Sequence, residues 1–197
     1  DSEHGGTGTE LSDIMESIEK QQFVNPVILK EHFWKMFVVD AFLGNFDRHN
    51  GNWGFLYDPD SQKAEIAPIF DCGSCLLPQA DEKVMERILH DENELNARIF
   101  QFPTSAVKLE GKKIRYYDFL MSGQSEDCNE ALIQIVPKIH VETIQNFLEE
   151  VPYLSDLQRT FYLTYIQARL EKLLLPAYKQ AVSQKDDMTL SSKGPIQ

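Results

Sequence analysis

The motif NFDRHNGN occupies residues 45–52, and a second motif, APIFDCG, follows at residues 67–73. Between Asn52 and Asp71 lie two apolar, aromatic-rich segments, residues 53–57 and 64–70, which are separated by the strong turn signal DPDS at residues 58–61. This pattern predicts a β-hairpin. The two outer ends of a hairpin lie close together, so we expect Asn52 and Asp71 to converge at its open end.

Three side chains in these motifs form the set that phosphoryl transfer from ATP requires. The reaction needs a carboxylate that orients the acceptor hydroxyl and takes its proton, and Asp47 suits that role. It also needs hard oxygen ligands for Mg²⁺, and Asn52 and Asp71 offer an amide and a carboxylate oxygen. Magnesium keeps several waters and shares its shell with substrate phosphates, so two protein ligands are enough.

The order Asp47-Arg48-His49, then Asn52, then Asp71 resembles the catalytic and metal-binding motifs of the HipA-like kinases, which are bacterial serine/threonine protein kinases known from toxin–antitoxin systems. It also resembles the phosphoinositide kinases and other atypical kinases. By this resemblance Asp47 is the catalytic aspartate, and Asn52 and Asp71 bind magnesium. Arg48 and His49 are structural or face the phosphates, with His49 in the ATP site.

The resemblance is strong over residues 33–77 and implies a mainly α (α+β) fold, a kinase-like C-terminal lobe with one small β-hairpin that carries the site. No phosphate-covering loop and no strand lysine precede Asp47. We therefore expect the C-terminal lobe of a larger or split kinase. The predicted divisions are residues 1–26, a flexible or lobe-connecting segment; residues 27–182, the lobe; and residues 183–197, a disordered tail.

Two other motifs have alternative interpretations. The glycine-rich residues 5–9 lack the Lys-Ser/Thr ending of a P-loop, and we favour a flexible loop there. The CxxC at residues 72–75 is followed by Pro78, which argues against the long helix of a thioredoxin-type site. With Cys128 as the third cysteine, the chain also lacks the four ligands of a structural zinc site.

Composition indicates one folded domain. The 197 residues are 42% hydrophobic, and no apolar run approaches the length of a membrane span. The formal charge of −12, from 19 Lys plus Arg against 31 Asp plus Glu, disfavours direct binding of nucleic acid or anionic lipid. Few cysteines and the absence of a signal-peptide pattern favour a cytoplasmic protein. The resemblance to the HipA-like kinases implies a bacterial protein whose partners are a protein substrate and an antitoxin or separate N-lobe.

The remaining segments are predicted to be scaffold. An amphipathic helix is expected over residues 27–43, with Pro26 in its first turn and Gly44 after its end. One polar helix is expected over residues 81–97, and a loop with a short strand over residues 98–123. A helix ending at Pro152 and a capped helix starting at Ser155 close the domain.

Two alternatives to a protein kinase remain open from the sequence. The missing phosphate-gripping elements suit a pseudokinase or binding lobe that acts by docking an N-lobe or an antitoxin. The Asp-Arg-His order also suits an atypical lipid or small-molecule kinase, although the acidic composition disfavours a membrane substrate.

Overall fold

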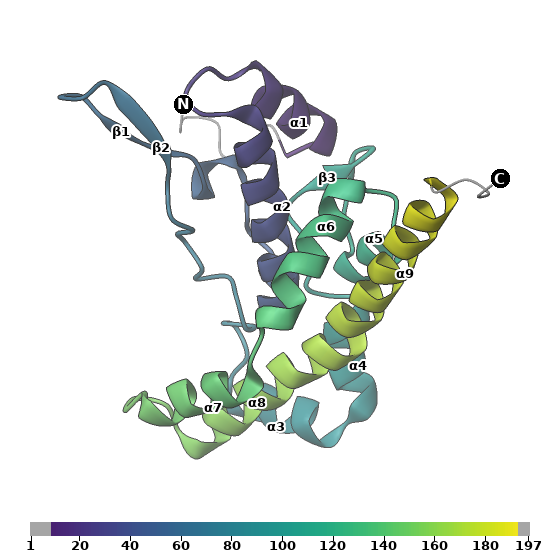
Figure 1. Cartoon of the computed structure of the whole chain (residues 1–197). Coiled ribbons are helices and arrows are strands. Elements are labelled where there is room, and N and C mark those ends of the chain that lie inside the picture. Colours follow the sequence, from purple (N-terminus) through teal and green to yellow (C-terminus); the bar gives the residue numbers. More distant parts are fainter. Residues whose placement is uncertain (1–8, 193–197) are drawn as a thin grey trace.

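Helix α2, Pro26–Leu43, is the centre of the fold in the computed structural model, which describes residues 9–192 (Figure 1). The Asn25 side chain accepts a hydrogen bond of 2.9 Å from the Val27 amide, and Pro26 stands at the first helical position. Gly44, at a φ of 69°, ends the helix in the left-handed conformation. The prediction of a helix over residues 27–43 is confirmed.

The surroundings of α2 differ from the amphipathic helix that we predicted. Its buried side chains run almost without interruption from Phe33 to Phe42 and so point in every direction around the helix. The helix packs against α1 (Leu11–Lys20), α6 (Glu126–Ile135) and α8 (Asp156–Arg169). Enclosed in this way, α2 has no solvent face over its second half, which explains its nearly continuous apolar sequence.

Aromatic side chains fill the core around α2. Trp34 stacks on Phe119 with ring centroids 5.8 Å apart and meets Phe33 and Phe37 edge-on. Its indole N–H is fully enclosed by the core and has no hydrogen-bond partner among residues 9–192. The second tryptophan, Trp53, is half-buried and lies 5.6 Å from the Phe33 ring. Core packing is therefore the role of this aromatic stripe.

The predicted β-hairpin is present but shorter than expected. Strand β1, Phe55–Asp58, pairs with β2, Lys63–Ile66, in an antiparallel register that places Phe55 opposite Ile66. One further bond, from the Ala67 amide to the Gly54 carbonyl at 2.9 Å, extends the ladder. Pro68 has no amide hydrogen to continue it, so the chain beyond leaves the hairpin.

The single helix predicted over residues 81–97 is two helices. Helix α3, Glu82–His90, ends at Asp91, and α4, Glu92–Phe100, begins there. The Asp91 side chain accepts hydrogen bonds from the amides of Asn93 and Glu94, which makes it the N-cap of α4. An aspartate within a polar helical pattern thus marked a boundary and not a helix interior.

The middle of the chain contains a short strand within residues 98–123, as predicted, together with a pairing strand and two helices that the sequence patterns did not reveal. A two-residue hairpin, β3 (Lys108–Leu109) with β4 (Lys112–Lys113), is followed by helix α5, Tyr116–Ser122. Helix α6 comes next, and the Ser125 side chain caps it by accepting from the Cys128 amide at 3.2 Å. A short turn at Val136–Lys138 then leads toward α7. The domain is mostly helical, with two small antiparallel sheets in residues 9–192.

The last helices agree closely with their capping signals. Helix α7 spans Val141–Glu150, and α8 begins after Ser155 with the predicted capping box to Gln158. A π-helical turn, Leu170–Leu174, joins α8 to α9, Leu175–Ser192. No helix within residues 9–192 combines the length and the apolar character needed to cross a bilayer.

Both ends of the described chain contain helices where we predicted none. Helix α1 lies within the segment 1–26, and Ile14 and Ile18 bury its apolar side against the core. Helix α9 continues through residues 183–192, which we had assigned to a tail, and Lys185 pairs with Glu130 of α6 at 2.6 Å. Most of the glycine-rich segment, residues 5–8, lies outside the described residues.

A fully buried arginine at the end of α8 fixes the C-terminal end of α2. The Arg169 guanidinium donates to the backbone carbonyls of Ala41, at 2.8 Å, and Phe42. It also donates to the Arg98 carbonyl of α4 at 2.8 Å and lies over the Tyr165 ring. One side chain therefore satisfies carbonyls at the end of α2 that have no partner within the helix.

We expect Arg169→Met to lower the free energy of unfolding by about 3 kcal/mol or more, because buried carbonyls on α2 and α4 lose their donors while the volume is kept. Urea denaturation measures the change. The control is Arg87→Met: that side chain is exposed and lies 3.7 Å from Glu94, so its loss should cost no more than about 0.5 kcal/mol. Equal losses in the two variants would contradict this role.

Candidate active site

The site begins where α2 ends. A Cβ atom at Gly44 would meet the Tyr165 hydroxyl of α8 and would lie 3.3 Å from Pro103. A glycine is needed here both for its positive φ and for this close approach. The chain therefore leaves α2 at a sharp, tightly packed turn, and the motif at residues 45–52 starts from a fixed position.

Asn45 holds the first part of the motif in place. Its side-chain amide donates to Asp40 Oδ1 at 2.8 Å, and its Oδ1 accepts from the Asp47 amide at 3.0 Å. The Tyr116 hydroxyl donates to the Asn45 carbonyl at 2.6 Å, and burial raises the pKa of Tyr116, so the hydroxyl keeps this proton. Asn45 thus connects α2, α5 and the backbone of the proposed catalytic residue.

Arg48 is the buried anchor of the site. Its Nε and Nη2 donate to the two carboxylate oxygens of Asp40 at 2.9 and 3.1 Å. Its Nη1 donates to the Asn52 carbonyl at 2.7 Å and also to the Phe70 carbonyl. The guanidinium therefore joins α2, the end of the first motif and the residue before Asp71. Of the two roles predicted for Arg48, structural or facing the phosphates, these contacts favour the structural one.

Electrostatics keeps this pair intact although both side chains are buried. Burial raises the pKa of Asp40 above its ordinary value, while the hydrogen bonds from Arg48 and Asn45 pull it down. Burial lowers the pKa of Arg48, but the hydrogen bonds and the charge of Asp40 more than offset this, and its net shift is upward. Arg48 stays protonated, and its charge makes an interior carboxylate tolerable.

Asn52 and His49 shape the end of the motif, which forms a 3₁₀ turn at Asn50–Asn52. The buried Asn52 side chain donates from Nδ2 to the Asp47 carbonyl at 2.8 Å. Its Oδ1 accepts no hydrogen bond from any residue in the described part of the chain, so the oxygen is available to a metal. His49 Nδ1 accepts from the Gly51 amide at 3.0 Å, so this nitrogen serves the loop.

The two aspartates of the predicted set are exposed to solvent. Asp47 projects from a backbone held on both sides, by Asn45 at its amide and by Asn52 at its carbonyl. Asp71 adopts a left-handed backbone with φ of 52°, a conformation that aspartate tolerates better than most residues. Because one Arg48 nitrogen binds the carbonyls of Asn52 and Phe70, the backbones beside the two proposed metal ligands converge.

This set of oxygen donors fits a hard cation such as magnesium. Among residues 9–192 no three His, Cys, Asp or Glu side chains lie close enough together to enclose an ion. One amide oxygen and one exposed carboxylate instead leave most of an octahedral shell to water and phosphate, which is the arrangement that Mg²⁺ prefers. The assignment of Asn52 and Asp71 as its ligands remains a prediction.

The loop after Asp71 folds back on the end of α2. The Cys75 amide donates a hydrogen bond to the Cys72 carbonyl at 3.1 Å, and the Leu76 amide donates one to the Leu43 carbonyl at 2.9 Å. All three cysteines are free thiols. Cys72 is exposed, whereas Cys75 is buried, and burial raises the pKa of the Cys75 thiol to about 12. Such a thiol is a poor nucleophile, which disfavours redox chemistry at this CxxC.

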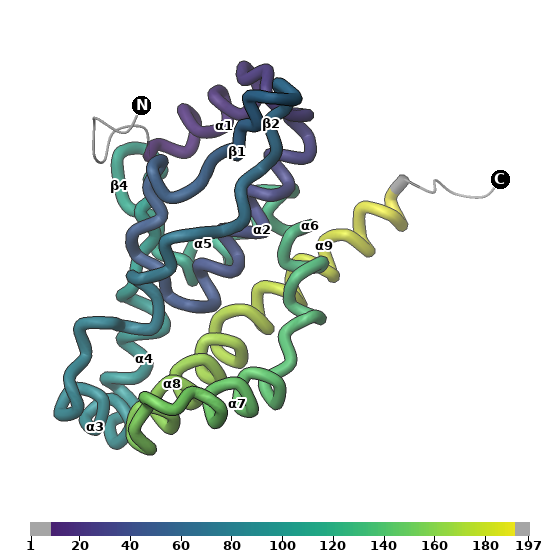
Figure 2. Tube along the Cα trace, turned by 90° about the vertical axis from the view of Figure 1, so that its left-hand side faces the viewer, coloured from purple at the N-terminus to yellow at the C-terminus, as the bar shows by residue number. Residues whose placement is uncertain are grey.

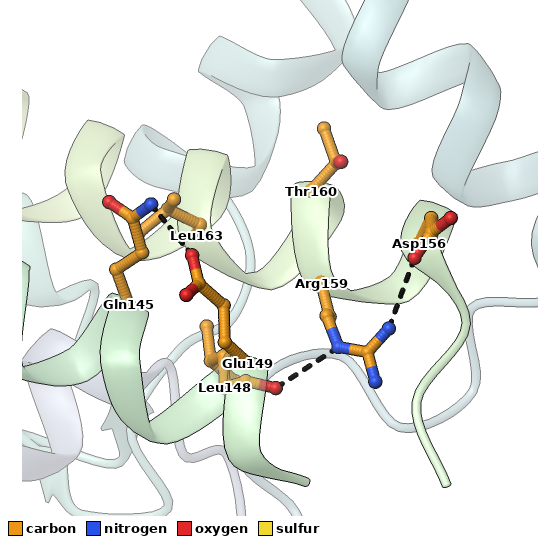
Figure 3. Close-up of a pocket in the computed structure, with 7 residues that line it drawn as sticks. All are labelled: Gln145, Leu148, Glu149, Asp156, Arg159, Thr160 and Leu163. Atoms are coloured by element: carbon orange, nitrogen blue, oxygen red, sulfur yellow. Dashed lines mark hydrogen bonds and ion pairs between the residues drawn. The ribbon is translucent and has the colours of Figure 1, made fainter. Parts of the chain in front are cut away.

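A separate pocket of about 310 Å³ lies between α7 and α8, away from these motifs (Figure 3). Its arginine, Arg159, donates to the Leu148 carbonyl and pairs with Asp156 at 3.1 Å. Gln145 likewise bonds to Glu149 on the same wall. The polar groups of this pocket are already satisfied by each other, so it provides no candidate catalytic set.

Comparisons with known proteins agree on one relative. A serine/threonine-protein kinase from Helicobacter pylori, CtkA, is 46% identical over 181 residues, which are 91% of this chain and 56% of that protein. The crystal structure of a Helicobacter pylori proinflammatory kinase CtkA superposes with a TM-score of 0.89 at 45% identity and covers 93% of this chain and 67% of that one. The chain belongs to the CtkA family. No protein-family model matches it.

Membership of the CtkA family establishes homology to a serine/threonine kinase. The chain spans about half the length of the curated CtkA relative that it matches. These comparisons name CtkA, so the finer resemblance to HipA-like kinases, with its antitoxin, remains an expectation from the motifs. The same holds for the roles of Asp47, Asn52, Asp71 and His49 in any CtkA-like reaction.

Sequence reasoning missed two residues of the site. Asp40 precedes the motif and Asn45 is its first residue; neither was given a role from the sequence, yet they hold Arg48 and Asp47 in place. A signal was present for Asp40, because a lone acidic residue within the apolar run 36–43 must be paired if it is buried. That reasoning predicts a buried cationic partner for Asp40, and the structure shows that this partner is Arg48.

We expect Arg48→Lys to lower the free energy of unfolding by about 2 kcal/mol or more, because an ammonium cannot bind Asp40 through two parallel bonds while it reaches Asn52 and Phe70. Urea denaturation again measures it. The matched control is Arg115→Lys, an exposed arginine paired with Asp118 at 2.6 Å, whose replacement should cost no more than about 0.5 kcal/mol. An unchanged free energy of unfolding in Arg48→Lys would show that Arg48 is not the anchor of the site.

Proposed function

We propose that this chain is the catalytic lobe of a serine/threonine protein kinase that transfers the γ-phosphate of ATP to a protein hydroxyl with Mg²⁺. One observation carries the proposal: Arg48 joins the loop of Asp47 and Asn52 to the loop of Asp71 through the Asn52 and Phe70 carbonyls. Homology to the CtkA kinases supports it. Both proposed metal ligands thus belong to one rigid unit with the proposed catalytic residue.

Each residue of the unit has a distinct role in the proposed reaction. Asp47 is exposed on a fixed backbone, so it can accept a hydrogen bond from the acceptor hydroxyl and take its proton. Asn52 offers Oδ1, and Asp71 offers a carboxylate, to a magnesium ion that, when bound, neutralises charge on the transferred phosphate. His49 keeps the turn between Asp47 and Asn52 in shape through the Gly51 amide.

Positioning is what such a site contributes to the rate. Phosphoryl transfer demands little covalent chemistry from the protein, so catalysis depends on holding the nucleophile, the metal and the phosphates in line. The network from Asp40 through Asn45 and Arg48 provides that rigidity, because each of its members is buried and fully bonded.

We expect Asp47→Ala to reduce phosphate transfer by about 10²- to 10⁴-fold, which is the usual worth of a positioned general base. The assay measures incorporation of labelled phosphate into protein, with the chain supplied with an ATP-gripping N-lobe. The control is Asp60→Ala, an exposed aspartate in the hairpin turn that we expect to leave the rate unchanged. Equal activity of wild type and Asp47→Ala would refute the assignment.

A second candidate function is binding alone, and one surface favours it. Five apolar side chains at one end of the molecule each leave more than half of their surface exposed: Phe23, Val27, Ile28, Leu56 and Tyr57. Phe23 reaches the hairpin, since its ring lies 5.3 Å from that of Phe55. In both overall views the hairpin and the α1–α2 connection share this end (Figures 1 and 2). An apolar cluster of this kind suits docking of an N-lobe.

Calorimetry with ATP and Mg²⁺ separates the two candidates. A lobe that only docks a partner should bind no nucleotide, whereas the proposed kinase lobe, without an N-lobe, should still bind ATP through Mg²⁺ on Asn52 and Asp71. We expect binding that is lost in Asp71→Ala and kept in Asp60→Ala. Micromolar binding by this chain alone would count against the docking function, and binding unaffected by Asp71→Ala would count against the metal assignment.

A further inference from the structure

A small pocket has as one wall Phe102, whose ring contacts the residue before the proposed catalytic aspartate. It has a volume of about 180 Å³ and lies between the segment that follows Asp71 and the helices α3 and α4. Figure 2 shows that segment passing from β2 along one side of the molecule to α3. Two of the residues that line the pocket are polar, Gln79 and Arg98, and five are apolar: Leu77, Ala80, Val84, Ile88 and Phe102.

Two contacts connect this Phe102 pocket to the active site. The Phe102 ring packs on that of Phe46, with centroids 5.7 Å apart, and Phe46 immediately precedes Asp47. On the opposite wall, Leu77 follows Leu76, whose amide bonds to the Leu43 carbonyl at the end of α2. The pocket is thus connected to the site on two sides, through Phe46 to Asp47 and through Leu76 to the end of α2.

The lining selects an apolar occupant. Phe102 is 41% exposed, a large fraction for an aromatic side chain that forms the wall of a pocket. The one cation, Arg98, is already paired, since Glu94 accepts from it at 3.4 Å, and its carbonyl is bound by Arg169. The pocket therefore offers no unpaired charge to an acidic or basic ligand, and its volume suits one side chain of medium size.

Resting on the proposed function, we propose that the Phe102 pocket binds an apolar side chain of the protein substrate, one or two residues from the serine or threonine that accepts the phosphate. An extended peptide advances about 3.3 to 3.6 Å per residue. A hydroxyl at Asp47 then brings a neighbouring side chain over Phe46 and into the pocket. The substrate class is a segment with a Leu, Ile or Met next to its target hydroxyl.

Peptide binding tests this directly, without any phosphate transfer. Four fluorescein-labelled peptides each contain one serine and one leucine, with the leucine one or two residues before or after the serine. The reference peptide has alanine at all four of these positions. Fluorescence anisotropy measures their affinity for the chain. We expect one leucine position to bind about tenfold or more tightly than the alanine reference, as burial of several methyl and methylene groups predicts.

Two variants should remove this preference by different routes. Ala80→Phe fills the pocket, and Phe102→Ala removes its exposed wall, so each should reduce the leucine preference to less than twofold. The control is Thr160→Phe, which fills the pocket between α7 and α8 and should retain the preference (Figure 3). Equal affinity of all peptides, no binding of any leucine peptide, or a preference that survives in both pocket variants would overturn the inference.

The same peptides distinguish this inference from the proposed function. Asp47→Ala should leave the leucine preference intact, because the pocket and the base act separately. A preference that disappears in Ala80→Phe, with no phosphate transfer by the wild-type chain and its N-lobe, would support the pocket and refute the kinase assignment. Phosphate transfer to the leucine and alanine peptides at equal kcat/KM would support the kinase assignment and refute the pocket.

Discussion

The buried pairing of Arg48 with Asp40 is the constraint on which the site depends. Removing both charges from water is costly, and the cost is tolerable only if every donor finds an acceptor. Asp40 accepts hydrogen bonds from two nitrogens of the guanidinium, and the Asn52 and Phe70 carbonyls accept from the third. The loops therefore have little freedom: a shift in either one leaves a buried charge without its partner, so the geometry of the motif follows from the energetics of one guanidinium.

A second arginine acts on the same helix for a different reason. No carboxylate within residues 9–192 pairs with Arg169; it satisfies carbonyls at the C-terminal end of α2 and lies against the Tyr165 ring. Positive charge at a helix C-terminus is favourable, and here it is also fully buried. Helices α8 and α2 are thereby locked together at the point where the motif begins, so the scaffold and the site form one cooperative unit.

How much of this could be predicted depended on whether the signal was local. Caps and stops at Asn25, Gly44 and Ser155 located α2 and α8, and the turn at residues 58–61 located the hairpin. Helices α1, α5 and α6 were missed because they are short and their apolar faces make sense only against neighbours distant in sequence. The motif located the site, and the apolar run 36–43 carried a signal for Asp40, whereas the bonds that Asp40 and Asn45 make to Arg48, Asp47 and Tyr116 depend on the tertiary fold.

The two tryptophans of the chain stand in opposite surroundings. Trp34 is sealed among Phe33, Phe37 and Phe119, with its indole N–H unpaired, while Trp53 is half-buried and directly follows Asn52. Indole emission depends on contact with water and on nearby groups. The molecule thus contains two native optical probes, one that responds to melting of the core and one that responds to occupancy of the loop, and neither requires a label.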